Sequence, residues 1–254
     1  MLNELLSTDI FKLMLVFSRL GMAMMLIPGI GGTLIPARAR MLLAVVISFL
    51  LLPVLGPQLP GMPQDLSRMF LLLLGEVTVG LFFGVLTQIL MSSLDLAGNF
   101  IGYSAGLTNA FVFDPVSESQ SQLITGFLNT AAISLVFVTN THHLMLRALV
   151  DTYGVFTPGQ PLPFEDMSVM LVSTAGKSFT VGIQLASPLV VFSLVFNTGL
   201  GMLNRLVPQM QVFFVGMPLQ IMVGLGILMV SLPAIMFWFM RHLTEGIGVF
   251  LAPG

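Results

Sequence analysis

The 254-residue sequence contains no cysteine and very few charged residues. Without cysteine there can be no disulfide, no thiolate metal ligand and no cysteine nucleophile. Charged residues make up only 8% of the chain, whereas a water-exposed surface usually carries charge on about 25–35% of its positions. Hydrophobic residues make up 56%, and the mean hydropathy is +1.00. Most of the surface must therefore face lipid or partner subunits.

The few charges do not form a basic surface. The net charge is −2, the isoelectric point is near 5.8, and the nine Lys and Arg residues are scattered along the chain. Proteins that bind nucleic acid usually gather such residues on one face. The sequence therefore indicates no nucleic-acid partner.

Charge-poor segments predict the fold. A helix needs about 20 apolar residues to cross a hydrocarbon core of about 30 Å, and six segments approach or exceed that length. Their residues are rich in Leu, Met, Val and Ile without alternation, which favours membrane helices over membrane strands. The sequence predicts an all-α membrane protein with about six long, partly broken hydrophobic helices, at residues 11–35, 41–55, 69–94, 123–146, 167–203 and 212–240.

Proline clusters separate some of these segments. One cluster precedes the third segment and another precedes the fifth, and proline disfavours helix interiors. We interpret them as loops, so residues 1–254 are predicted to form a single integral-membrane domain. The prolines concerned are Pro53, Pro57, Pro60, Pro63, Pro158, Pro161 and Pro163.

The sequence shows no recognisable set of catalytic or metal-binding groups, so we expect neither an enzyme nor a bound cofactor. His142 and His143 are adjacent and would point about 100° apart on a helix, which does not suit chelation of one metal ion. We interpret them as structural residues near an interface.

Glu76 is the one carboxylate within a strongly apolar run, LLLLGEVTVGLFFG. An ionisable group there is costly and is a candidate functional residue, although a helix-packing role is the simpler interpretation.

The first and last segments each contain or adjoin a pair of prolines. Pro28 and Pro36 of the first segment correspond in this respect to Pro208 and Pro218 of the last. Matching broken helices can mark a transport site. A proton-coupled small-solute transporter is therefore one alternative, and chance placement of the prolines is the other.

Two sets of glycines recur at four-residue spacing. Gly80 and Gly84 form one set, and Gly98, Gly102 and Gly106 form the other. This spacing lets another helix backbone approach closely. We therefore expect tight helix packing at both places.

Residues 98–123 mix glycine, aromatic and amide residues and include Phe-Asp-Pro followed by a Ser/Gln-rich run. Irregular backbone at membrane depth is tolerated only where protein buries it or where it lines an aqueous cavity. Phe111 and Phe113 are candidates for a hydrophobic constriction that excludes water from a pore. The alternative is that both are interfacial anchors or core residues.

Several motifs also resemble one family, in order from about residue 11 to residue 246. They are R-L…P…I-P-A-R at 19–38, G-N-F-I-G-x-x-x-G-L at 98–107, F-D-P at 113–115, G-L-G-M-L-N-R-x-x-P-Q at 199–209 and F-x-x-G-x-P at 213–218. The chain resembles the FliR family of flagellar type III export-gate proteins. Injectisome export proteins share the pattern more loosely.

The resemblance implies a non-enzymatic core subunit of the flagellar export gate in the bacterial inner membrane, within the flagellar basal body. It implies assembly with FliP-like and FliQ-like subunits into a helical, protein-conducting channel that works with FlhB and FlhA on unfolded flagellar subunits. It implies a plug loop that keeps the channel closed, made by Gly106, Asn109, Phe111, Phe113, Asp114 and Pro115. It further implies structural or inter-subunit roles for Pro36, Arg38, Asn204, Arg205, Pro208, Gln209 and Pro218. For Arg205, a lipid-phosphate contact is the alternative.

Overall fold

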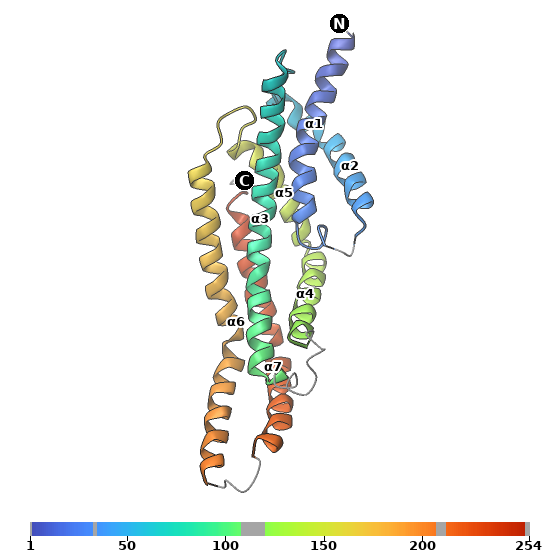
Figure 1. Ribbon diagram of the computed structural model, residues 1–254. Coiled ribbons are helices and arrows are strands. Elements are labelled where there is room, and N and C mark those ends of the chain that lie inside the picture. The colour runs from blue at the N-terminus through green and yellow to red at the C-terminus, as the bar shows by residue number, and fades with distance from the viewer. Residues whose placement is uncertain (1, 33–34, 108–119, 207–211, 252–254) are drawn as a thin grey trace. The chain divides into compact units, whose positions relative to one another are not determined.

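Most of the chain that the structure describes is helical. The computed structural model describes residues 2–32, 35–107, 120–206 and 212–251, and that part contains no strand. This confirms the predicted all-α class. Figure 1 shows the helices in chain order, with a short 3-10 turn, η1 (Gly56–Gln58), after the second. They are α1 (Leu2–Leu26), α2 (Ala37–Leu55), α3 (Leu66–Ser104), α4 (Gln120–Val138), α5 (Thr141–Val155), α6 (Phe164–Leu206) and α7 (Val212–Gly248).

Several helices are long and apolar enough to cross a membrane. Within the described residues, four meet this description: Ala37–Gln58, Leu66–Ser104, Phe164–Leu206 and Gly216–Gly248. The pair α4 and α5, bent by 75°, makes a fifth if it counts as one broken span. These helices are those of an integral membrane protein.

The chain divides into two compact units. Unit 1 comprises Met1–Leu90, Val136–Thr174 and Thr244–Gly254, and unit 2 comprises Met91–Leu135 and Ala175–Leu243. The long helices α3, α6 and α7 contribute residues to both units.

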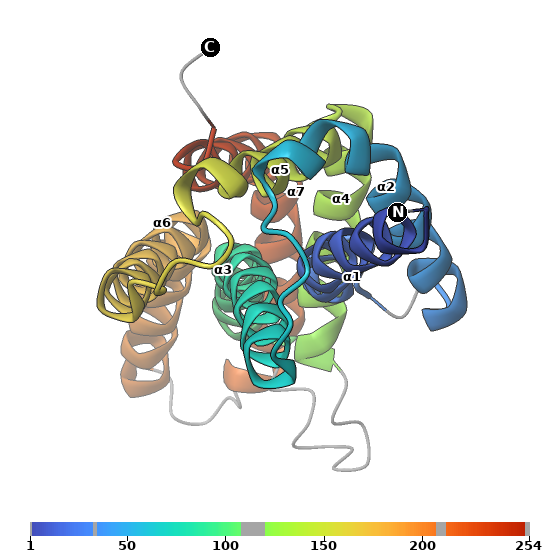
Figure 2. The same ribbon diagram turned by 90° about the horizontal axis from the view of Figure 1, so that it is seen from above.

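In unit 1, α1 and α2 form an antiparallel pair, visible in Figure 1 and, from above, in Figure 2. The buried stripe of α1 follows helical periodicity through Leu15, Arg19 and Ala23. The same holds for α3, where Glu76, Val79 and Phe83 are buried at spacings of three and four residues. Each stripe is apolar except for one ionisable residue.

Glycines of α3 allow α1 to lie close to it. A Cβ atom added at Gly84 would lie 2.6 Å from Leu26 Cβ, and one at Gly80 would collide with the backbone carbonyl of Arg19. The tight packing expected from the Gly80 and Gly84 spacing is therefore present between α3 and α1.

In unit 2, α6 and α7 run antiparallel (Figure 1). The Ser178 hydroxyl on α6 lies 3.0 Å from the Nε2 atom of His242 on α7. The part of α3 in this unit packs on α4, where a Cβ at Gly98 would lie 2.7 Å from Thr125 Cα. Of the second predicted set of glycines, Gly98 therefore lies at a contact with α4.

Four predictions about helix extents and loops were wrong. The first segment does not continue to residue 35: α1 ends at Leu26, because Pro28 has no amide hydrogen to continue the helix and Gly29 adopts a left-handed φ of 84°. The segment 123–146 is broken, because Asn140 has a φ of 59° between α4 and α5. Helix α3 also extends to Ser104, into the stretch that was expected to be irregular. Pro53, assigned to a loop, lies inside α2.

The α1–α3 contact can be tested with two glycines of one helix. Gly80→Ala should destabilise the protein by about 1–3 kcal/mol, because the new methyl group meets backbone that cannot move aside. Gly75→Ala is the control, since a Cβ there meets nothing within 4 Å and alanine favours helix by up to about 1 kcal/mol. Thermal unfolding in detergent measures both, and equal melting temperatures would show that the two helices are not in close contact.

Candidate functional site

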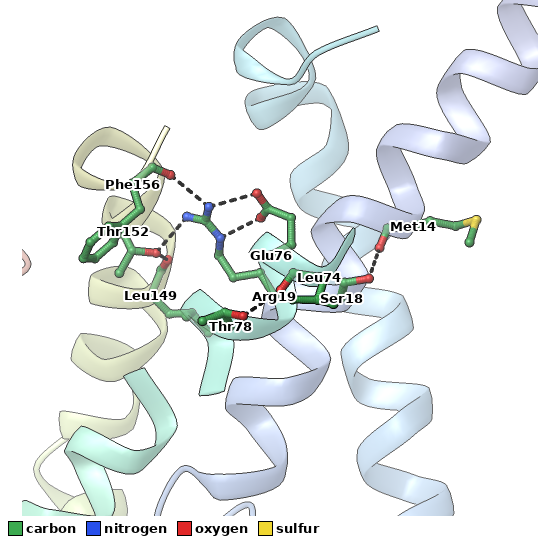
Figure 3. Close-up of polar contacts among 9 residues, drawn as sticks. All are labelled: Met14, Ser18, Arg19, Leu74, Glu76, Thr78, Leu149, Thr152 and Phe156. Atoms are coloured by element: carbon green, nitrogen blue, oxygen red, sulfur yellow. Dashed lines mark hydrogen bonds and ion pairs between the residues drawn. The ribbon is translucent and has the colours of Figure 1, made fainter. Parts of the chain in front are cut away.

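Arg19 and Glu76 form a buried ion pair in unit 1 (Figure 3). The Arg19 Nε atom donates to Glu76 Oε2 at 2.7 Å, and one terminal nitrogen donates to Oε1 at 3.1 Å. The residues are 1% and 3% exposed. Both carboxylate oxygens therefore accept from a single guanidinium, the two-bond geometry that binds carboxylate most strongly.

The remaining Arg19 donors reach α5. One terminal nitrogen donates to the Thr152 hydroxyl at 3.2 Å, and the other also donates to the Phe156 carbonyl at 2.9 Å. The guanidinium lies 3.8 Å from the centre of the Tyr153 ring, within the range of a cation–π contact. Figure 3 shows the guanidinium between Glu76 on one side and Thr152 and Phe156 on the other.

This arrangement connects three segments that are far apart in the sequence: α1, α3 and the end of α5. Burying either charge alone would be costly, so each stabilises the other in place. Because both oxygens of Glu76 are already occupied by Arg19, the geometry favours the packing interpretation of Glu76 over a proton relay.

The sequence prediction recognised Glu76 but missed its partner. Arg19 lies within the first predicted apolar segment and begins one of the family motifs, but the prediction gave it no partner. It lies four residues after Leu15 and four before Ala23, on the apolar stripe of α1. A cation on that stripe and an anion within another apolar segment together indicate a pair. Thr152 and Tyr153 carried no comparable signal.

The third predicted segment ended at residue 94, whereas α3 continues to Ser104 and includes Asp95. In unit 2 it accepts a hydrogen bond from the Asn129 amide of α4. His142 lies 3.3 Å from the Val136 carbonyl through its Nδ1 atom, and its ring is next to that of His143. Within the described residues, no group of three or more His, Asp or Glu side chains is placed to hold a metal ion.

Of the predicted plug residues, the structure describes only Gly106. It follows the last residue of α3 and has a φ of 77°, in the left-handed region that glycine adopts without strain. Its amide donates to the Tyr103 carbonyl at 3.1 Å, which closes the final turn. The other predicted plug residues, Asn109, Phe111, Phe113, Asp114 and Pro115, lie outside the described residues.

The early Pro-Ala-Arg motif begins α2. The Pro36 carbonyl accepts bonds from the amides of Ala39 and Arg40, and the Arg38 side chain is exposed. The side chain of Arg40, which the prediction did not single out, donates to the Gly31 carbonyl at 2.6 Å and so ties the start of α2 to the turn after α1.

The later motif spans the end of α6 and the start of α7. Asn204 and Arg205 are exposed in the last turn of α6, and Pro218 is exposed inside α7. Pro208 and Gln209 lie outside the described residues. The side chains of Asn204 and Arg205 make no hydrogen bond or ion pair with the described residues, so both are available to a partner or to lipid.

One face of α6 is exposed and polar. Lys177, Thr180, Gln184 and Ser187 are exposed and recur at spacings of three and four residues, so they share one face. Ser178, Leu185, Ala186 and Leu189 on the other side are buried. The Thr180 and Ser187 hydroxyls bond to backbone carbonyls of α6 itself. The Lys177 and Gln184 side chains make no hydrogen bond or ion pair with the part of the chain that the structure describes.

The ion pair gives a prediction about stability. Arg19→Leu should cost about 3–5 kcal/mol, because it leaves the Glu76 carboxylate buried without a partner. The double variant Arg19→Leu with Glu76→Leu should be more stable than Arg19→Leu alone, since it removes both charges. Arg147→Gln is the control and should cost less than about 1 kcal/mol, because the Arg147 side chain is 69% exposed and its nearest approach to Asp151 is 3.9 Å. Thermal unfolding measures all three, and a double variant no more stable than the single would contradict the pairing.

Comparison with known proteins shows the family of this chain. The family model described as bacterial export proteins, family 1, matches residues 10–246. The flagellar biosynthetic protein FliR of Caulobacter vibrioides is 36% identical over 235 residues, covering 92% of this chain and 94% of that protein. FliR of Escherichia coli strain K12 is 30% identical, covering 86% and 82%, and FliR of Bacillus subtilis strain 168 is 29% identical, covering 89% and 88%. The chain therefore belongs to family 1 of the bacterial export proteins, the family of the flagellar biosynthetic protein FliR.

Proposed function

We propose that this protein is a core subunit of the flagellar type III export gate in the bacterial inner membrane. In this proposal, residues 1–254 form one integral-membrane domain that assembles with FliP-like and FliQ-like subunits into a channel for unfolded flagellar proteins. FlhB-like and FlhA-like proteins work with that channel. The subunit acts by forming a passage rather than by catalysis, and it needs no cofactor.

The observation that carries the assembly part of this proposal is the exposed face of α6. This helix has 43 residues and is among the helices apolar enough to span a membrane, yet it exposes Lys177 and Gln184. An unpaired ammonium group facing lipid is costly, whereas the same group is stabilised against a partner protein. A subunit interface accounts for both the polar face and the membership of an export family.

Apolar surface supports the same interpretation. Leu42, Phe49 and Leu50 of α2 are each 65–67% exposed, and similar side chains are exposed on α6 and α7. Such surface needs lipid or protein around it. We propose that Asn204, Arg205, Pro208, Gln209 and Pro218 lie at subunit contacts, together with Pro36 and Arg38.

We further propose that the segment after Gly106 closes the channel at rest, with Phe111 and Phe113 as the apolar barrier. A hydrophobic constriction excludes water and ions without strong polar bonds that cargo would have to break. Gly106, with its left-handed φ, sets the direction in which the chain leaves α3.

Co-purification tests the central proposal. A stable large complex with FliP-like and FliQ-like proteins is the expected result. A lone monomer or dimer that accumulates a small solute would instead favour the proton-coupled transporter. Glu76→Gln adds a second test. It removes the counter-charge of Arg19, so the comparison is made only on complexes that still assemble. Export should persist in such a gate, whereas a carrier that uses Glu76 would lose transport.

The barrier gives a prediction about leakage. Changing Phe111 and Phe113 together to Gly should make membranes that contain the assembled complex leak ions or small solutes, because the apolar side chains that exclude water are gone. Phe164→Gly is the control, since it removes an aromatic side chain that is 62% exposed at the start of α6 and is not part of the sequence assigned to the barrier. Conductance that stays at the closed level in the double variant would end the gating proposal.

The α6 face gives a prediction about assembly. Lys177→Glu should lower the yield of the co-purified complex, because it reverses a charge that a partner must accommodate. The melting temperature of the isolated subunit should change little, since the side chain is exposed. Lys177→Arg keeps the charge and is the control. A normal yield of complex with Lys177→Glu would mean that this face is not an interface.

A further inference from the structure

The end of α3 is held against α7 by a buried glutamine. Gln220, which is 3% exposed, donates its side-chain amide to the Ser104 carbonyl at 3.1 Å. That carbonyl belongs to the last turn of α3, where carbonyls lack partners within the helix. All of the residues concerned belong to unit 2.

Two further contacts make this junction tight. A Cβ atom added at Gly106 would lie 3.0 Å from the Gln220 Cδ atom, so the glutamine packs directly against the glycine. One turn further along α7, a Cβ at Gly224 would lie 3.0 Å from Ala105 Cα and 3.1 Å from Ala105 Cβ. Gln220 and Gly224 therefore contact three consecutive residues, Ser104–Gly106, at the point where the chain leaves α3.

We propose that Gln220 is a positioning residue for the gate: its amide and the Gly224 contact form a latch that holds the end of α3, Ser104–Gly106, against α7 in the closed state. The inference rests on the proposed gating function, because the latched residues directly precede the segment assigned to the barrier. Opening then requires the end of α3 to separate from α7, and the latch sets how often it does so.

The hydrogen bond can be removed without changing the size of the side chain. Gln220→Met keeps length and volume but has no donor for the Ser104 carbonyl. Loss of one such bond should shift the balance from latched to unlatched by about two- to tenfold. Leakage through the assembled complex should therefore rise by up to that factor, while the yield of the complex stays normal.

Gln160→Met is the matched control, because Gln160 is an exposed glutamine in the loop before α6 and its side chain makes no hydrogen bond with the described residues. Its leakage should equal that of the wild type. An assembled Gln220→Met complex as tightly closed as the wild type would overturn the latch.

A cross-link tests the same junction even if Gln220→Met fails to assemble. The chain contains no cysteine, so Ala105→Cys with Gly224→Cys introduces a unique pair within it. Disulfides need Cβ atoms about 3.5–4.5 Å apart, which a small shift from 3.1 Å provides. Oxidation should form the bond, stop export and keep the complex closed, and reduction should restore export.

The single variants Ala105→Cys and Gly224→Cys are the controls and should be insensitive to oxidant. Failure of the bond to form, or undiminished export with the bond formed, would overturn the proposal. The Phe111 and Phe113 variant separates this outcome from failure of the gate: if it leaks while the latch tests fail, the gate stands without the latch. If it stays closed as well, the gating function itself is wrong.

Discussion

The pairing of Arg19 with Glu76 is the interaction on which unit 1 depends. A lone charge in either apolar stripe would oppose the packing of α1 on α3, whereas the pair fixes one register between them. The guanidinium uses its remaining donors on Thr152 and Phe156, so the end of α5 is fixed by the same group. A purely apolar contact would not distinguish so sharply between neighbouring registers, because hydrophobic association is not directional.

Glycine provides the second constraint, since directional bonds between helices require their backbones to be close. Gly80 and Gly84 admit α1, and this brings the Arg19 backbone against α3 so that its side chain reaches Glu76. Surrounding lipid is as apolar as the side chains, so the hydrophobic effect does little to hold helices together there. Small residues that allow close approach and polar residues that pair across the contact act together instead. Unit 2 repeats the combination, with Gly98 on Thr125 beside the bond between Asn129 and Asp95.

The sequence was sufficient for the class, for the approximate positions of the helices and for the glycine contact at Gly80 and Gly84, because these follow from local composition and periodicity. It was insufficient at Asn140, where one left-handed residue bends an apolar run that has no proline, and no glycine near the bend. The sequence also did not predict the partners of Arg19 and Gln220. Both are polar residues whose partners are distant in sequence, and only the folded chain shows which carbonyl or carboxylate each one reaches.

Arg19 and Gln220 do different work despite similar burial. Arg19 makes four hydrogen bonds and a ring contact, an arrangement that resists any rearrangement around it. Gln220 holds the end of α3 with one hydrogen bond between neutral groups, which is weaker than a bond to a charged group. In the proposed gate, the helices stay rigid and the Gln220 contact yields, because a segment held by as many bonds as Glu76 would release far less often. The strengths of the two contacts therefore fit the proposal that unit 1 stays fixed around Arg19 while the end of α3 separates from α7.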